Sequence, residues 1–315
     1  MRPLYHIAII ATDLVGKDAG PSWLPEVNFR HLSGDARMSY RDLINGDRFP
    51  IDCSGTALMR RIEETRKALA VDGCAVLRGF LTREGVEALT GEADAVARYA
   101  PTSFNRTNPY FTRDDPELKP THPKRRFFER SNAFVPADKF LETGALRKIY
   151  NAPGFDGFIQ QCLQEDRFYR YADPLADVII NVADEGPGFP WHFDTNNFIV
   201  TLAIQNAEDG GEFEYAAGIR ERDENFDEVS KVLDGTSDRI TSIQLQPGDL
   251  QLFRGRYSLH RVAPLRGTRP RYVAIISYVE EPNMVATPER AMQLYGKVLP
   301  IHYQRNGQRA DTFID

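Results

Sequence analysis

The residues best suited to bind a metal ion are His192 and Asp194, in the stretch "GFPWHFDT" at 188–195. The pattern His-x-Asp or His-x-Glu is a weak signal by itself. A chain with six histidines and 45 acidic residues is expected to contain about one such triplet by chance. This pair, however, follows a Gly/Pro-rich loop and precedes an apolar run, and residues i and i+2 of a strand face the same side. Burying two polar groups unpaired inside an apolar barrel is costly, and a bound metal ion relieves that cost.

A metal site here needs a third protein ligand, and His260 is the best candidate. It follows "QPGDLQLF", which is typical of a turn and a strand, so a later strand of a barrel could bring it beside His192. Two histidines and one aspartate form the facial triad of non-haem Fe(II) oxygenases, which leaves coordination positions open for other ligands. The remaining histidines fall outside the β-rich region: His6, His31, His122 and His302.

Arg271 is a candidate for binding an anion near this site. An inward-pointing guanidinium offers two parallel hydrogen bonds to a carboxylate. A surface position at the start of a strand explains the residue equally well by itself, and Arg269 is an alternative two residues earlier. Alternation along "RYVAIISY" at 271–278 predicts one face with Arg271, Val273, Ile275 and Ser277, and the other with Tyr272, Ala274, Ile276 and Tyr278.

The composition is that of an ordinary globular protein, with 42% hydrophobic and 27% charged residues among 315. The net charge of −6 does not provide the positive field that nucleic-acid binding requires, and no nucleic-acid module is recognisable. The sequence therefore predicts no nucleic-acid partner, and it leaves the oligomeric state open.

The N-terminus and the cysteines suggest a cellular location. The apolar run that ends at Asp13 is too short to span a membrane, and we interpret it as a buried strand. Three scattered cysteines, at 53, 74 and 162, favour buried thiols in a reducing compartment over disulfides or a zinc site. We therefore expect a soluble cytoplasmic protein without a membrane partner.

The chain divides into a helical part, at about 55–170, and a β-rich part, at about 170–280. Leu58, Ile62, Thr65 and Leu69 share one helical face, and Thr82 is a predicted N-cap of a second helix. Residues 101–136 are predicted to be a long irregular segment, and 137–150 and 154–166 to be helical. A closing helix is predicted to start at Thr287.

Six β-rich runs separated by Gly/Pro turns predict a jelly-roll core. Since no linker splits the chain, we expect one domain over 1–315, of α+β class, with the helical part packed on the jelly roll. The predicted strands are 74–80 in the helical part and then 176–183, 198–206, 211–216, 239–246, 249–255 and 271–279.

Several stretches resemble the Fe(II)/2-oxoglutarate-dependent oxygenase superfamily, whose fold is a double-stranded β-helix. They are "WHFD", "TLAIQNAEDGGEFEY", "PGDLQLFRGRYSLHRVAP" and "RPRY", which together span roughly 170–280. More narrowly, "FYRYADPLADVIINV", "FPWHFDT" and "LQLFRGRYSLHRV" resemble a subgroup of amino-acid hydroxylases and radical amino-acid halogenases, and "DGCAVLRGFLTREGVEALTGE" resembles the strand and helix that precede their core.

The resemblance implies a dioxygenase that uses Fe(II), 2-oxoglutarate and O₂, and that converts 2-oxoglutarate to succinate while it oxidises a C–H bond. It places Fe(II) on His192, Asp194 and His260, and the distal carboxylate of 2-oxoglutarate on Arg271. Asn181, Thr201 and Ser277 are further candidates for cosubstrate contacts. Because halogenases of this subgroup have a small residue in place of the carboxylate ligand, the presence of Asp194 implies hydroxylation of a small amino-acid-like metabolite.

Other readings of the sequence remain open at this point. The same iron chemistry could give desaturation or ring closure on a larger natural product, and a cupin-type metal enzyme would not need Arg271. A non-enzymatic jelly-roll binding module would explain the strands but not an inward polar triad. Candidates for binding the substrate are Arg126, Arg130 and Asn132 for a carboxylate, and Asp173 and Asp177 for an ammonium group.

Overall fold

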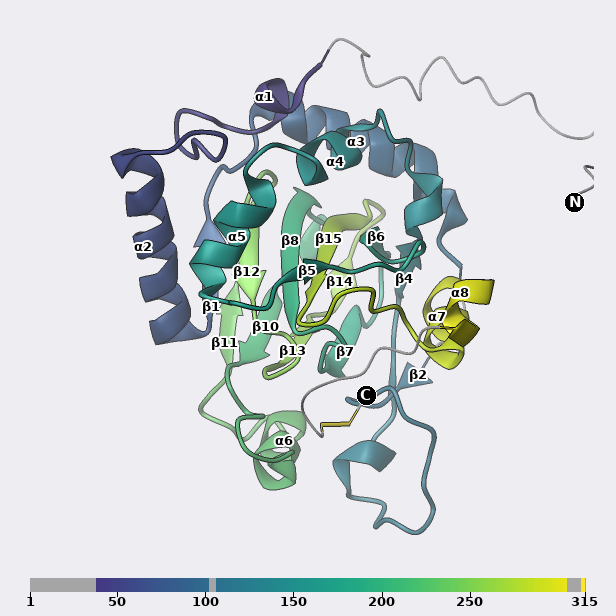
Figure 1. The fold of residues 1–315 in the computed structure, drawn as a ribbon. Coiled ribbons are helices and arrows are strands. Elements are labelled where there is room, and N and C mark those ends of the chain that lie inside the picture. The colour runs from purple at the N-terminus through teal and green to yellow at the C-terminus, as the bar shows by residue number, and fades with distance from the viewer. Residues whose placement is uncertain (1–37, 102–105, 305–312, 315) are drawn as a thin grey trace, which may run out of the picture.

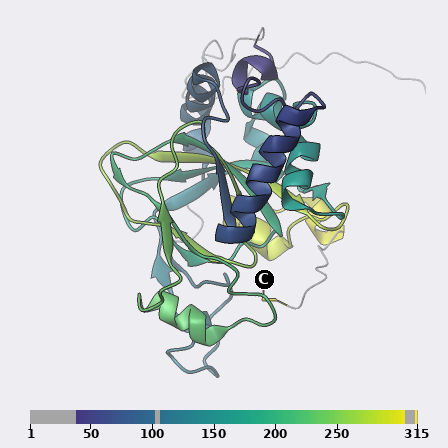
Figure 2. The same cartoon turned by 90° about the vertical axis from the view of Figure 1, so that its left-hand side faces the viewer.

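The computed structural model describes residues 38–101, 106–304 and 313–314. Two antiparallel sheets form its centre, helices cover one sheet, and α6 (Phe226–Leu233) lies at the opposite end from α1 (Tyr40–Leu43) and α3 (Arg83–Val96) (Figures 1 and 2). The strand predicted near the N-terminus, His6 and His31 lie outside the described residues.

The larger sheet has seven strands, and each neighbouring pair is antiparallel. Its long central strands are β8 (Phe198–Gln205) and β15 (Arg271–Val279), which lie side by side. The strand order is β1 (Cys74–Leu77), β12 (Leu250–Phe253), β8, β15, β6 (Val178–Ala183) and β4 (Asn132–Val135), with β5 (Tyr169–Arg170) paired to the end of β15.

The smaller sheet has four strands and carries the candidate metal ligands. Its order is β11 (Thr241–Ile243), β10 (Phe213–Ala216), β13 (Leu259–Val262) and β7 (Phe189–His192). Two short pairs complete the β-structure: β9 (Asp209–Gly210) with β14 (Leu265–Arg266), and β2 (Arg106–Thr107) with β3 (Phe128–Glu129).

Helices α2 (Thr56–Asp72), α3, α4 (Ala145–Tyr150) and α5 (Phe155–Leu163) cover the outer face of the larger sheet (Figure 1). Their buried side chains join the outward residues of the strands in one hydrophobic core. Near the C-terminus lie α7 (Pro288–Tyr295) and α8 (Pro300–Gln304). The 3₁₀ turns within the described ranges lie earlier in the chain and are η2 (Ala97–Tyr99), η3 (Pro123–Arg125) and η4 (Ala137–Lys139).

The alternation predicted for β15 is confirmed. Tyr272, Ala274, Ile276 and Tyr278 pack in the core beneath the helices, whereas Arg271, Val273, Ile275 and Ser277 line a cavity on the other face. A jelly roll with helices packed on it was the predicted fold, and it is also confirmed. One face of the larger sheet therefore packs in the hydrophobic core, and the other face lines the cavity.

The predicted helix starts are confirmed by their caps. The Thr82 hydroxyl accepts a hydrogen bond from the backbone N–H of Gly85, and the Thr287 hydroxyl accepts one from Arg290. No helix in the described part of the chain is both long and apolar enough to cross a membrane.

Three expectations need correction. The segment at 101–136 is not wholly irregular, because β4 adds to the larger sheet through pairing with β6, a distant partner that a local pattern does not reveal. Strands β7 and β13, at four residues each, were not predicted as separate strands. Cys53 is exposed, although the other two free thiols, Cys74 and Cys162, are buried as predicted.

Candidate active site

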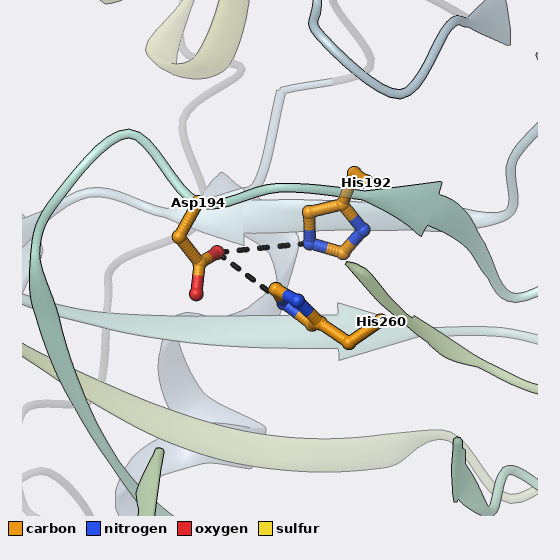
Figure 3. Close-up of side chains that lie close together, drawn as sticks. All are labelled: His192, Asp194 and His260. Carbon is orange, nitrogen blue, oxygen red and sulfur yellow. Dashed lines mark ion pairs between the residues drawn. The ribbon is translucent and has the colours of Figure 1, made fainter. Parts of the chain in front are cut away.

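The side chains of His192, Asp194 and His260 converge between the two sheets (Figure 3). His192 ends β7 and lies directly opposite His260 on β13, so strand pairing alone brings the two rings together. The Asp194 Oδ1 atom lies 3.7 Å from Nε2 of His192 and 3.4 Å from Nε2 of His260. One atom from each residue lies within 4.8 Å of the others, a spacing that suits a single metal ion.

The backbone orients both imidazole rings. Nδ1 of His192 lies 2.7 Å from the carbonyl oxygen of Pro190, and Nδ1 of His260 lies 2.9 Å from that of Ser258. A ring that donates from Nδ1 keeps its proton there, which leaves the Nε2 lone pair for a metal. Burial lowers the pKa of His192 well below its usual value, as do the charges of nearby cationic groups, so this ring is neutral at neutral pH.

Asp194 occupies its position because Gly255 has no side chain. The Asp194 backbone N–H donates to the carbonyl oxygen of Gly255 at 3.1 Å, which brings the two segments together. A Cβ atom on Gly255 would lie 1.7 Å from Oδ2 of Asp194, far inside van der Waals contact. Any larger residue at 255 would therefore displace the carboxylate from the two histidines.

The three residues border a cavity of about 140 Å³ between the sheets. Arg271 faces this cavity from β15 and is 5% exposed. Its guanidinium makes no hydrogen bond or ion pair with any residue in the described ranges, and burial lowers its pKa to about 10, while the charge of Glu212 acts in the opposite direction. An anionic ligand would compensate this buried charge.

Arg269, the alternative to Arg271, is placed elsewhere. It is exposed, and its guanidinium donates to the backbone carbonyls of Asn206 and Ala207 at 3.0 and 3.1 Å. The geometry therefore favours Arg271 as the anion-binding arginine.

Three further predicted cosubstrate residues, Asn181, Thr201 and Ser277, also line the cavity. Asn181 is 3% exposed, and neither its Oδ1 nor its Nδ2 has a hydrogen-bond partner among the described residues. A buried amide without partners costs about 1–3 kcal/mol, which a ligand with complementary atoms would recover. The Thr201 hydroxyl instead donates to Oε1 of Gln251 at 2.8 Å.

The residues predicted to bind substrate are not gathered at one place. Arg130 is half-buried, and its guanidinium lies 5.0 Å from the ring centroid of Phe189, a cavity residue, and donates to the carbonyl of Asn132. Asn132 is 7% exposed, and both polar atoms of its amide lack partners in the described part of the chain. Neither residue lines the cavity itself.

The other three predicted substrate residues have structural partners away from the cavity. Asp173 accepts hydrogen bonds from the backbone N–H groups of Leu175 and Ala286, and its carboxylate lies 3.2 Å from Nε2 of His302. Asp177 pairs with Arg147, and Arg126 pairs with Asp234 at 2.7 Å. All three side chains already have partners within the protein, and none of them lines the cavity, so the geometry does not support a role for them in substrate binding.

Four residues of the site had been overlooked in the sequence. Gln251 is a lone polar residue in the apolar run "LQLF", a signal that alternation could have revealed. Phe111, Arg290 and Gly255 gave no local signal, because their roles depend on neighbours far along the chain.

A family model described as Halogenase D matches residues 58–294 of the sequence. The chain belongs to this family. No curated protein matches it. Among solved structures, the non-haem alpha-ketoglutarate-dependent epimerase SnoN from nogalamycin biosynthesis is similar at 12% identity and a TM-score of 0.50, over 70% of this chain and 82% of that one.

Two other solved structures match at lower scores. An oxidoreductase of the 2OG-Fe(II) oxygenase family from Burkholderia pseudomallei is 11% identical, with a TM-score of 0.45 over 70% of this chain and 91% of that one. A prolyl hydroxylase from Trichoplax adhaerens, in complex with a peptide fragment, is 13% identical, with a TM-score of 0.47 over 73% of this chain and 95% of that one. The match to the Halogenase D family, with the fold shared with SnoN, supports the predicted superfamily. The narrower resemblance to the subgroup of amino-acid hydroxylases and radical amino-acid halogenases stays a prediction.

Proposed function

We propose that this protein is an Fe(II)/2-oxoglutarate-dependent oxygenase that hydroxylates an unactivated C–H bond of a small amino-acid-like metabolite. The observation that carries this proposal is the convergence of His192, Asp194 and His260 in one cavity with the buried guanidinium of Arg271. A metal-binding triad and an anion-binding arginine on the same cavity are what an enzyme needs to hold both iron and a dicarboxylate.

The residues present fit the implied metal. Two imidazole Nε2 atoms, each oriented through a backbone carbonyl at Nδ1, and one carboxylate form a donor set that suits Fe(II). When bound there, iron with 2-oxoglutarate and O₂ supplies the oxidant for C–H cleavage, and 2-oxoglutarate leaves as succinate and CO₂. The protein contributes binding, orientation and exclusion of water.

Residues on the larger sheet would bind the cosubstrate. Arg271 would bind the distal carboxylate of 2-oxoglutarate, since its buried charge has no hydrogen-bonded acid in the described ranges. Asn181 would contribute its unpaired amide to a ligand beside Arg271, and Thr201 and Ser277 border the same space. Aromatic rings complete the lining and keep bulk water from the reacting centre: Phe111, Phe134, Phe189, Phe213 and Phe253.

Halogenation is the second candidate, because the family description names a halogenase. Chloride would need a coordination position on the metal, and the Asp194 carboxylate, 3.7 Å and 3.4 Å from the Nε2 atoms of His192 and His260, would take that position instead. Its negative charge also disfavours a second anion on the same ion. These two effects favour hydroxylation over halogenation in this chain.

An anaerobic titration tests the proposal. Addition of 2-oxoglutarate to the Fe(II)-loaded protein should produce a weak visible charge-transfer band, which arises only when the keto acid chelates iron. After O₂ is admitted, succinate should form. Absence of the band in the wild-type protein with stoichiometric iron would contradict the use of 2-oxoglutarate and favour a cupin-type enzyme.

Chloride separates the two candidate reactions. Mass spectrometry of a complete reaction, run with excess chloride and a substrate that stimulates succinate formation, should show addition of oxygen and no chlorine. A chlorinated product from the wild-type protein would show that Asp194 does not fill the metal position.

A further inference from the structure

The carboxylate of the candidate metal site lies on a loop, whereas both histidines lie on strands. His192 ends β7 and His260 lies within β13, so strand pairing fixes the positions of the two rings. Asp194 follows β7 and precedes β8, outside both strands. The position of its carboxylate therefore depends on the tertiary contacts that hold residues 193–197, which we call the metal loop.

Two buried arginines contact the residues on either side of Asp194. The guanidinium carbon of Arg220 lies 3.9 Å from the ring centroid of Phe193, the residue before it. Arg256 donates from Nη1 to the carbonyl oxygen of Thr195, the residue after it, at 3.1 Å. The two arginines are 1% and 0% exposed, and Arg220 also donates to the carbonyl oxygen of Arg256 at 3.3 Å. They therefore form one connected, buried support for the metal loop.

The same two arginines bind the backbone of Phe313 and Ile314, which we call the C-terminal strap. Arg256 donates from Nη2 to the carbonyl oxygen of Phe313 at 3.4 Å, and Arg220 donates from Nη2 to that of Ile314 at 3.1 Å. The Glu224 carboxylate accepts from the backbone N–H of Ile314 at 2.6 Å and from Nε of Arg220 at 2.7 Å. Each arginine therefore joins the C-terminal strap to the metal loop.

This arrangement makes the metal loop and the C-terminal strap depend on each other. A buried guanidinium is costly unless its donors find acceptors. If the strap is displaced, a donor of each arginine loses its acceptor, and the arginines no longer have a fixed position beside the loop. The Ile314 side chain also packs against the apolar cluster that contains Phe193, which adds a second contact between the two segments.

We propose that the C-terminal strap, through Arg220 and Arg256, positions the Asp194 carboxylate to bind the metal ion. This inference rests on the metal site of the proposed function. The two arginines are positioning residues, because neither lines the cavity and both act through the metal loop. Thr195 and Asn196 of this loop do line the cavity, so the same support also shapes its wall.

Metal binding without turnover tests this inference. Arg256→Met removes the hydrogen bonds to the loop and to the strap. We expect the Kd of Mn(II), measured by calorimetry, to rise at least about tenfold, an effect typical of residues that orient metal ligands. In an Asp194→Gly background the same substitution should change the Kd less than about twofold, because the ligand that it positions is gone. Arg256→Lys should recover part of the affinity, since it keeps the charge and can still donate to one carbonyl.

Arg147→Met is the matched control for loss of a buried arginine. Arg147 is 8% exposed, pairs with Asp177 and donates to the carbonyl oxygen of Ala137, and none of the three lines the cavity. This variant should lose stability in chemical denaturation while its Kd for Mn(II) equals that of the wild type.

Glu224→Gln tests the arrangement from the side of the strap. Glutamine offers one acceptor oxygen in place of two, so either Ile314 or Arg220 loses its acceptor. We expect the Kd of Mn(II) to rise at least about threefold, the effect of one lost hydrogen bond. Glu228→Gln is the matched control, because the Glu228 side chain is equally exposed, at 14%, and pairs instead with Lys231. Its Kd should equal that of the wild type.

Several results would overturn the inference while the proposed function stands. They are an unchanged Mn(II) Kd in Arg256→Met that is folded by circular dichroism, equal losses from this substitution with and without Asp194, and an equal loss in Arg147→Met. An unchanged Kd in Glu224→Gln would also overturn it, and this variant decides the matter if Arg256→Met does not fold. If the wild type itself does not bind Mn(II), the proposed function fails and the inference fails with it.

Discussion

The two sheets serve the candidate site in different ways. The larger sheet carries Arg271 and Asn181 on long or fully buried strands, and helices cover its other face. The smaller sheet carries both histidines on strands of four residues, and its outer face packs against α6 and neighbouring loops through Trp191 and Leu259. Ligand binding and fold stability therefore both depend on the larger sheet, whereas the smaller sheet chiefly brings the metal ligands together.

If this contrast is correct, the largest effect on metal binding will come from the smaller sheet. His192→Ala or His260→Ala removes one of three protein ligands, and we expect loss of stoichiometric iron and of 2-oxoglutarate turnover. Iron content after reconstitution, with circular dichroism to check the fold, measures this. Full iron content and activity in either variant would refute the metal site.

Gly255→Ala should have the next largest effect. The added Cβ would collide with the Asp194 carboxylate, so we expect metal affinity to fall at least about tenfold. In an Asp194→Gly background the same substitution should cause no further loss, because the colliding group is gone. Mn(II) titration of the four proteins measures the coupling.

Gly91→Ala is the matched control for that experiment. Gly91 lies within α3, and a Cβ atom there would meet nothing within 4 Å. Its metal affinity should equal that of the wild type. Equal losses from Gly255→Ala with and without Asp194 would contradict the proposed steric role.

Arg271→Leu tests the larger sheet's part in binding. Loss of one charge-assisted pair is worth roughly 1.5–3 kcal/mol, so the Kd of 2-oxoglutarate should rise at least about tenfold while metal affinity changes little. Arg269→Leu is the control, since that guanidinium is bonded to backbone carbonyls at the surface. If only the Arg269→Leu variant bound 2-oxoglutarate more weakly, Arg269 rather than Arg271 would be the residue that binds its carboxylate.

The smallest effect on the site should come from the covered face of the same strand. Ile276→Val removes one buried methyl group beneath the helices and should lower the free energy of unfolding by about 0.5–1.5 kcal/mol, with the Kd values of metal and 2-oxoglutarate unchanged. Ile275→Val, on the cavity face, should cost less stability because Ile275 is only partly buried. Chemical denaturation compares the two. If Ile276→Val changed the ligand Kd values more than Ile275→Val does, the proposed division between a stabilising face and a binding face would be wrong.

Features that depend only on neighbours along the chain could be predicted from the sequence. The alternation along β15 assigned Arg271 and Ser277 to one face, and hydroxyl caps marked the starts of α3 and α7. Strand alternation and helix capping are local, so a short window of residues contains all that they require. The His-x-Asp motif with a later histidine is a weak signal. Its interpretation as an iron site therefore depended on the resemblance to a known superfamily.

Contacts between residues that are far apart in the chain became visible only in the folded protein. Register between β7 and β13 sets His192 opposite His260, and the approach of Gly255 leaves space for Asp194. The same packing gave Asp173, Asp177 and Arg126 structural partners, although their residue types had suited a substrate site. Whether a charged side chain is available depends on which opposite charge folding brings within a few ångströms, and no local pattern in the sequence contains that distance.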